Sequence, residues 1–164
     1  SFDNEKVGEY QARGVLAAGW GGPASGWAVT SWYELRRDGL AANQHNFLYP
    51  DQDAKEAYLT KRLRKDGGGP VIATSDWEHQ VQDSIREWVP APYYTLGADG
   101  FGFSDTRPAA RRYLKIDSHS MVVRALQALA DQGSVDRSVV QKAIEKYDLF
   151  NVDAGESGGT GGDA

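Results

Sequence analysis

The chain of 164 residues has 40% hydrophobic and 25% charged residues, a composition typical of one soluble domain with a sizeable core. Its net charge of −5 argues against a nucleic-acid-binding protein, which would present a basic face. The absence of cysteine excludes disulfides and thiolate metal sites, and no apolar run is long enough to span a membrane. We therefore expect a cytoplasmic protein that binds neither nucleic acid nor membrane.

The amino-terminal part is predicted to contain an irregular segment, a helix and a strand, followed by a second helix. Residues 1–10 are mostly polar and are expected to be irregular. The composition then turns helical over residues 9–20, until glycines and a proline interrupt it. Residues 26–30 form a candidate buried strand. Ser31 follows with Glu34 three residues later, and this capping-box spacing predicts the start of a helix.

The middle of the chain alternates helical and strand patterns. Residues 51–65 carry apolar side chains at helical spacing, and residues 71–75 are the clearest buried strand. Ser75 or Asp76 is expected to cap the next helix. One face of that predicted helix would carry Trp77, Val81, Ile85 and Trp88.

A second apolar run, residues 93–97, leads into a loop that contains Gly97, Gly100 and Gly102. Side-chain oxygens of Ser104, Asp105 and Thr106 precede a helix predicted over residues 107–114. Two further amphipathic helices are expected, the first from Ser118 to a stop at Gly133 and the second from Asp136 or Ser138. The glycine-rich, acidic tail, residues 153–164, is expected to be flexible.

This alternation predicts an α/β fold in which helices cover both faces of a mostly parallel sheet. Three strands are evident, near residues 26–30, 71–75 and 93–97. Three strands are few for such a sheet. Either a further strand comes from a weaker segment, or the chain lacks its first strand.

The glycine loop and the helix after it are the leading candidate for a binding site. The amino end of that helix, together with nearby guanidinium groups, is a possible anion site. A second interpretation is a tight structural corner whose arginines contact carboxylates of a neighbouring domain. The residues that carry both interpretations are Gly100, Gly102, Thr106, Arg107, Arg111 and Arg112.

Other candidate chemistry is weak at the level of sequence. His45, His79 and His119 lack the spacing of metal ligands, and the aspartates beside helix starts are explained by capping. No dinucleotide fingerprint, P-loop or nucleophile elbow is present. The five tryptophans suggest either an interface or a tryptophan-rich core. The residues alone predict no catalytic, cofactor-binding or metal-binding side chain.

Four motifs occur in an order that resembles one protein family. The chain is similar to the carboxyl-terminal domain of homodimeric pyruvate dehydrogenase, the thiamine-diphosphate-dependent first component of the pyruvate dehydrogenase complex. The tryptophan at position 32 and the Gly-Phe-Gly-Phe run are closer to actinobacterial members. The motifs are residues 29–39 (VTSWYELRRDG), 46–50 (NFLYP), 73–76 (ATSD) and 96–107 (LGADGFGFSDTR).

The resemblance implies a transketolase carboxyl-terminal-like domain over residues 11–152, a three-layer α/β/α sandwich with one antiparallel strand. It implies that the whole enzyme is a homodimer that decarboxylates pyruvate and passes acetyl groups to the lipoyl arm of dihydrolipoyl acetyltransferase. Thiamine diphosphate and Mg²⁺ would be bound by other domains of that enzyme and by no residue of this chain. The implied role is structural support of the dimer, and the alternative is a free-standing anion-binding or protein-interaction module.

Overall fold

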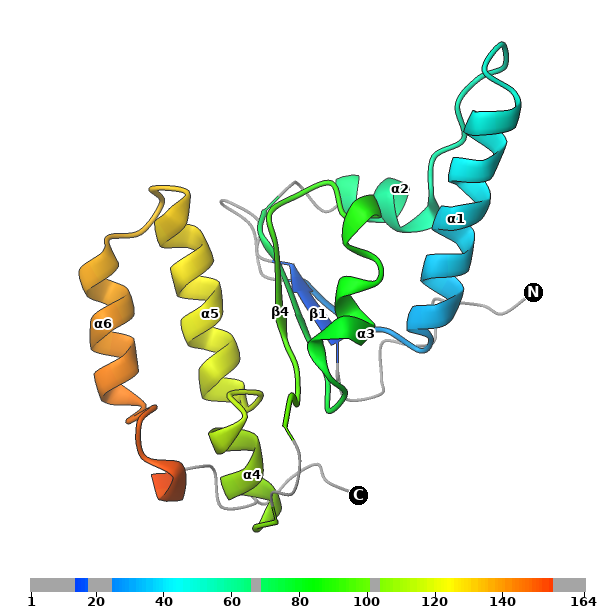
Figure 1. The fold of residues 1–164 in the computed structure, drawn as a ribbon. Helices are drawn as coiled ribbons and strands as arrows, with labels where there is room; N and C mark the ends of the chain where they lie inside the picture. The colour runs from blue at the N-terminus through cyan, green and yellow to red at the C-terminus, as the bar shows by residue number, and fades with distance from the viewer. Residues whose placement is uncertain (1–13, 18–24, 66–68, 101–103, 155–164) are drawn as a thin grey trace.

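A four-stranded sheet forms the middle layer of the protein (Figure 1). The computed structural model describes residues 14–17, 25–65, 69–100 and 104–154, with residues 14–17, 25–27 and 154 described through their backbone alone. The strand order is β2-β1-β3-β4. The strands are β1 (Gly14–Ala17), β2 (Ser25–Ala28), β3 (Val71–Thr74) and β4 (Tyr93–Leu96).

The direction of the strands agrees with a mostly parallel sheet that has one antiparallel member. β1 pairs antiparallel with both β2 and β3, with Val15 opposite Trp27 on one side and Ala73 on the other. β3 pairs parallel with β4, so that Ile72 lies opposite Tyr94. Consequently β2, β3 and β4 run in one direction and β1 in the other.

Helices cover both faces of this sheet, which confirms the three-layer architecture (Figure 1). One face carries α1 (Trp32–Leu48), α2 (Tyr58–Arg64), α3 (His79–Asp83) and the 3₁₀ turn η2 (Arg86–Trp88). The opposite face carries α4 (Arg107–Tyr113), α5 (Ser118–Asp131), α6 (Arg137–Lys146) and the 3₁₀ turn η3 (Val152–Ala154).

Side chains of the central strands separate into two sets, because successive residues of a strand point to opposite faces. Val71, Ala73 and Tyr93 join the apolar cluster beneath α1 and α2. Tyr94 points to the other layer, where its hydroxyl donates to Asp131 over 3.3 Å and the Arg124 guanidinium lies 4.7 Å from its ring centroid. Both layers are therefore anchored on β3 and β4.

The predicted start of α1 is confirmed. The Ser31 hydroxyl accepts a hydrogen bond from the backbone N–H of Glu34 at 3.2 Å, and the helix begins at Trp32. The helix runs 17 residues and ends at Leu48, just before Tyr49 and Pro50. Its carboxyl-terminal half extends beyond the rest of the molecule (Figure 1).

The prediction of a helix over residues 9–20 is wrong, because Gly14–Ala17 forms strand β1. A run as short as Val15-Leu16 fits either state locally, and long-range pairing decides between them. Here the strand fills the gap between β2 and β3, with backbone hydrogen bonds on both edges. The missing fourth strand therefore comes from a weak segment. The irregular segment expected at residues 1–10 lies outside the described residues.

Two predicted helices are shorter than expected. α2 begins at Tyr58 instead of near residue 51, because the Tyr58 N–H is bonded to the Asp38 carboxylate at 2.6 Å. The helix expected from Ser75 or Asp76 begins only at His79, and Trp77 is 68% exposed instead of sharing a buried face with Ile85 and Trp88.

The carboxyl-terminal helices follow the predictions. Thr106, Asp117 and Asp136 each accept a hydrogen bond from a backbone N–H in the first turn of α4, α5 and α6. α5 and α6 pack together through a small apolar cluster that includes Val123, Val140 and Leu149.

Of the tail expected to be flexible, residues 153 and 154 belong to η3, and the remainder lies outside the described residues. No helix of the described ranges is long and apolar enough to cross a membrane.

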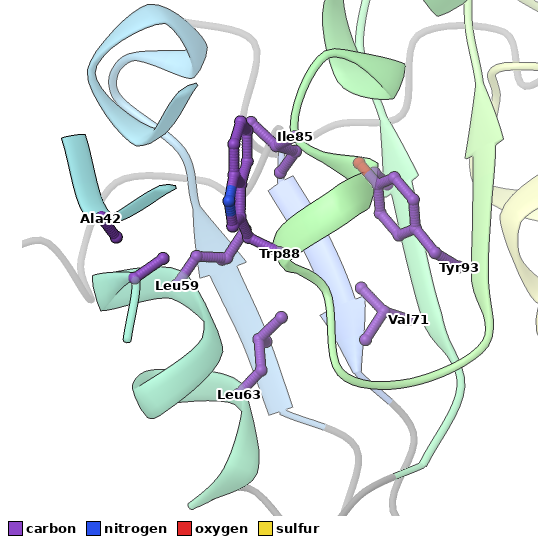
Figure 2. Packing of buried hydrophobic residues seen from close by; sticks show 9 residues of the cluster. Ala42, Leu59, Leu63, Val71, Ile85, Trp88 and Tyr93 are labelled. Carbon is purple, nitrogen blue, oxygen red and sulfur yellow. The ribbon is translucent and has the colours of Figure 1, made fainter. Parts of the chain in front are cut away.

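Trp88 is the largest side chain of the cluster beneath α1 and α2 (Figure 2). Its indole N–H donates to Asn43 over 3.2 Å, and its ring lies against α1 at Gly39. A Cβ at position 39 would stand 2.2 Å from the ring, so only glycine permits this close approach. Trp88 and Gly39 together set the distance between α1 and the 3₁₀ turn η2.

We expect Gly39→Ala to lower the free energy of unfolding by about 1–3 kcal/mol, because the added methyl overlaps the Trp88 ring. Urea unfolding followed by circular dichroism measures the change. In the Trp88→Leu background the same substitution is expected to cost less, because the smaller side chain leaves room for the methyl. Equal costs in the two backgrounds would contradict the proposed contact.

Candidate functional site

The ends of the parallel strands β3 and β4 meet at one edge of the sheet, where ligands bind in many α/β proteins. We call the segments that follow these strands, residues 75–79 and 97–100, the carboxyl corner. Hydrogen bonds extend the pairing of the strands into it: Ser75 N–H donates to Leu96 O at 3.2 Å, and Ala98 N–H to Trp77 O at 2.8 Å. The corner is therefore a continuation of the sheet.

A histidine and an aspartate join the two halves of the corner. Asp99 accepts the backbone N–H of His79 at 2.9 Å with one carboxylate oxygen and contacts the His79 ring nitrogen Nδ1 with the other. The hydrogen bond from the His79 backbone lowers the pKa of the Asp99 carboxyl, and the imidazole contact adds to this effect. Twenty residues separate the partners, so no local signal in the sequence could have shown the pair.

A carboxylate that orients an imidazole is also part of catalytic triads, where the ring acts on a hydroxyl or thiol. In this corner the Ser75 hydroxyl accepts a hydrogen bond from the Trp77 N–H at 3.1 Å and contacts the Gln82 side chain. The histidine–aspartate pair instead fastens the beginning of α3 to the loop after β4. We therefore assign the pair a structural role.

Gln82 supports the corner from beneath. Its side chain is fully buried and contacts the Ser75 hydroxyl, and its backbone carbonyl accepts the Tyr93 hydroxyl at 3.0 Å. Burial is the main cause that raises the pKa of the Tyr93 phenol, so this group stays a hydrogen-bond donor at neutral pH. These contacts hold α3 against both parallel strands.

Gly97 is the position where the two halves of the corner come closest. A Cβ on this residue would lie 2.5 Å from the backbone nitrogen of His79 and 2.9 Å from its Cα. These neighbours are backbone atoms, which cannot rotate away as a side chain would. Gly97 is thus required by close packing, which is the structural interpretation of the glycine loop.

Arg112 is fully buried and does not reach solvent. Its Nε donates to the Asp117 carboxylate at 2.5 Å, and one terminal nitrogen donates to the carbonyls of Tyr147 and Asp148 at 2.7 and 3.2 Å. The other terminal nitrogen lies 2.7 Å from Nδ1 of His119. Because a guanidinium only donates, this imidazole nitrogen acts as the acceptor. The prediction of Arg112 as a ligand for an external anion is therefore wrong.

The remaining candidate residues do not converge on one anion. Thr106 caps α4 through its hydroxyl, which accepts the Ala109 N–H at 3.4 Å. Arg111 lies 3.6 Å from the Asp76 carboxylate and so connects α4 to the carboxyl corner. Arg107 is the first residue of α4, and Gly100 has a φ of 154°. Gly102 lies outside the described residues, and an interdomain contact through the other members stays a prediction.

The described residues hold no group of three or more metal-ligating side chains arranged to bind an ion. The carboxyl corner thus contains three structural contacts: the hydrogen-bonded pair of His79 and Asp99, Gly97 packed against the His79 backbone, and the ion pair between Arg111 and Asp76. The arrangement is that of a rigid support that presents Trp77 at its surface.

Comparison with known proteins identifies the fold family. The family model described as "Transketolase-like TK C-terminal domain" matches residues 9–117. The chain belongs to this family. Residues of α5 and α6 lie beyond the part that the family model matches, although they complete the second helical layer of this transketolase C-terminal domain.

Several proteins named "Pyruvate dehydrogenase E1 component" are relatives of this transketolase C-terminal domain. That of Mycolicibacterium smegmatis is 50% identical over 144 residues, which are 88% of this chain and 15% of the relative. That of Corynebacterium glutamicum is 48% identical over 139 residues, 85% of this chain and 15% of the relative. That of Escherichia coli K12 is 36% identical over 145 residues, 88% of this chain and 16% of the relative. The chain thus spans about a sixth of the length of these relatives, and the resemblance to actinobacterial members is confirmed.

We expect the stability of the domain to fall in acid because of Asp117. Burial raises the pKa of this carboxyl, but hydrogen bonds from Ser120 and the Arg112 guanidinium outweigh that effect and leave the pKa below its ordinary value. A lowered pKa stabilises the folded state above the unfolded-state pKa of about 3.9, and this stabilisation disappears as the pH falls through the folded-state pKa.

Urea unfolding between pH 7 and pH 2.5 measures this dependence. Asp117→Asn should be less stable than the wild type at pH 7, by about 3–5 kcal/mol, since it leaves the Arg112 charge buried without its partner. The difference between the two proteins should shrink as the pH falls. Asp53→Asn, at an exposed position, serves as the control. A difference that stays constant with pH would contradict the assignment.

We expect Gly97→Ala to loosen the carboxyl corner, because the new methyl overlaps the His79 backbone. The cost should be about 1–3 kcal/mol of unfolding free energy. Hydrogen exchange followed by NMR should show faster exchange of the Ala98 N–H, which is bonded to Trp77 O in the wild type. Gly133→Ala is the control, because it is strained by a φ of 75° instead of by a close neighbour, and a Cβ there meets no atom within 4 Å. Unchanged Ala98 exchange in Gly97→Ala, or equal acceleration in both variants, would refute this interpretation.

Proposed function

We propose that this chain is the carboxyl-terminal domain of a pyruvate dehydrogenase E1 component and that it supports the enzyme's dimer without carrying the reaction centre. The observation behind the proposal is the 50% identity to an E1 component over 144 residues, which are only 15% of that relative. A domain of this size contributes a small share of the whole enzyme. The partners in this proposal are the other domains of the enzyme, a second subunit and the dihydrolipoyl acetyltransferase of a cytoplasmic complex.

The described residues do not fit the cofactors of the proposed enzyme, thiamine diphosphate and Mg²⁺. A diphosphate–Mg²⁺ site needs oxygen ligands gathered around one ion. The described residues contain no such group, and the aspartates of the carboxyl corner are engaged with His79 and Arg111. The proposal therefore assigns cofactor binding to other domains of the E1 polypeptide.

The alternative of a free-standing anion-binding module has less support from the geometry. Arg112, which that hypothesis needs at the surface, is buried and paired with Asp117. The hydroxyl of Thr106 serves the amino end of α4. Support of a larger protein requires only a rigid domain with defined surfaces, and the carboxyl corner and the two helical layers provide one.

We expect the 164-residue chain to release no CO₂ from pyruvate when thiamine diphosphate and Mg²⁺ are added, because the reaction centre would lie elsewhere. Release of ¹⁴CO₂ from [1-¹⁴C]pyruvate measures the activity. The positive control is a full-length E1 polypeptide that ends in this chain, which should decarboxylate pyruvate under the same conditions. Activity of the short chain, or inactivity of the properly folded long one, would contradict the proposal.

A further inference from the structure

Helix α1 carries a second apolar face in addition to the one that packs on the core. Tyr33, Leu40 and Phe47 recur every seven residues, and such residues lie nearly above one another on a helix, with a drift of only about 20° per step. Their exposed fractions are 67%, 42% and 83%. We call these three residues the α1 stripe. Leu48 and Tyr49, at the tip of the helix, are exposed as well.

The α1 stripe is separate from the side of the helix that packs on the core. The side of α1 that meets the core is formed by Gly39 and Ala42, with Trp32 and Leu35 partly buried beside them. At 100° per residue, Ala42 and Leu40 point about 160° apart. Gly39 and Leu40, as successive residues, point about 100° apart, so the α1 stripe lies on a different face of the helix from the core residues. Tyr33 and Phe47, its two outer members, are largely exposed.

The exposed end of α1 is held firmly, even though it extends beyond the sandwich (Figure 1). The Asn46 side chain bonds the backbone of Lys55 twice, donating to its carbonyl at 2.9 Å and accepting its N–H at 2.7 Å. Asp38 accepts the Tyr58 N–H at 2.6 Å. The returning segment is therefore fixed to the helix at two points. Such a surface loses little conformational entropy when a partner covers it.

A row of exposed apolar side chains on a rigid element that projects from the molecule marks an interaction surface. The partner is indicated by the length of the relatives, in which the matched region accounts for only 15% of the polypeptide. We propose that the α1 stripe and the tip of α1 dock onto the remaining part of the E1 polypeptide, through an apolar surface of that part. This proposal rests on the proposed function, since it takes its partner from there.

The test introduces one cysteine at a time into the 164-residue region, which has no cysteine of its own. Phe47→Cys places a thiol on the α1 stripe. Phe150→Cys is the matched control, because Phe150 is an equally exposed phenylalanine, at 85%, between α6 and η3. Each variant is made in the 164-residue chain and in the full-length E1 polypeptide. Labelling by a maleimide is followed peptide by peptide with mass spectrometry.

We expect both thiols to react rapidly in the short chain. In the full-length polypeptide the Phe47→Cys thiol should react at least about tenfold more slowly, while the Phe150→Cys thiol keeps its rate. Equal rates at the two positions in the full-length protein would overturn the proposal. Protection in the short chain that rises with protein concentration would also overturn it, because a second copy of this chain would then be the partner.

A second variant tests the docking without a reactive label. Phe47→Glu should leave the thermal unfolding midpoint of the short chain unchanged, since the side chain is exposed there. In the full-length protein the same substitution should lower the midpoint. Phe150→Glu should leave the midpoint of both proteins unchanged. Pyruvate decarboxylation is measured on the same samples. An active full-length enzyme with an unprotected Phe47→Cys thiol refutes the docking alone. A protected thiol in a protein that does not decarboxylate pyruvate refutes the proposed function alone.

Discussion

The buried guanidinium of Arg112 is the constraint on which the second helical layer depends. A charge without access to water is tolerated only if its donors are paired, and the acceptors here come from two separate segments, the start of α5 and the residues after α6. Asp117 begins α5, the carbonyls of Tyr147 and Asp148 follow α6, and His119 lies in the first turn of α5. The ends of three helices must therefore meet at one point, and this requirement fixes how α4, α5 and α6 are arranged.

The opposite layer is held by shape instead of charge. Trp88 fills the space between α1, α2 and the sheet, and the absence of a side chain at Gly39 lets the helix approach its ring. The carboxyl corner connects both helical layers to the sheet. On one side, the hydrogen bond between Tyr93 and Gln82 holds α3 on β4, and on the other side Arg111 links α4 to Asp76. Rigidity of this kind suits a domain that supports other parts of an enzyme.

Local chemistry made much of this fold predictable from the sequence. The caps at Ser31 and Asp136 and the buried strand 71–74 depend on neighbouring residues, and they were found where the sequence placed them. The failures all involve distant partners. β1 is a strand because two other strands flank it, and α2 starts late because Asp38, twenty residues earlier, holds its first N–H. Likewise, sequence reasoning could not tell that Arg112 is enclosed by α5 and α6, so its charge was taken for a surface feature.

The glycine loop after β4 has a consequence for how family motifs are interpreted. Its sequence resembles a binding loop, yet Gly97 is needed because the backbone of His79 lies within 2.5 Å of where a Cβ would be, and Asp99 is needed to hold that backbone. Both requirements are steric or local electrostatic ones, and neither involves a ligand. Residues under such requirements tolerate few replacements in any protein that keeps this fold. A motif can therefore identify a family because its residues are required by the fold itself. The residues of the α1 stripe are instead constrained by the surface of the partner that they contact.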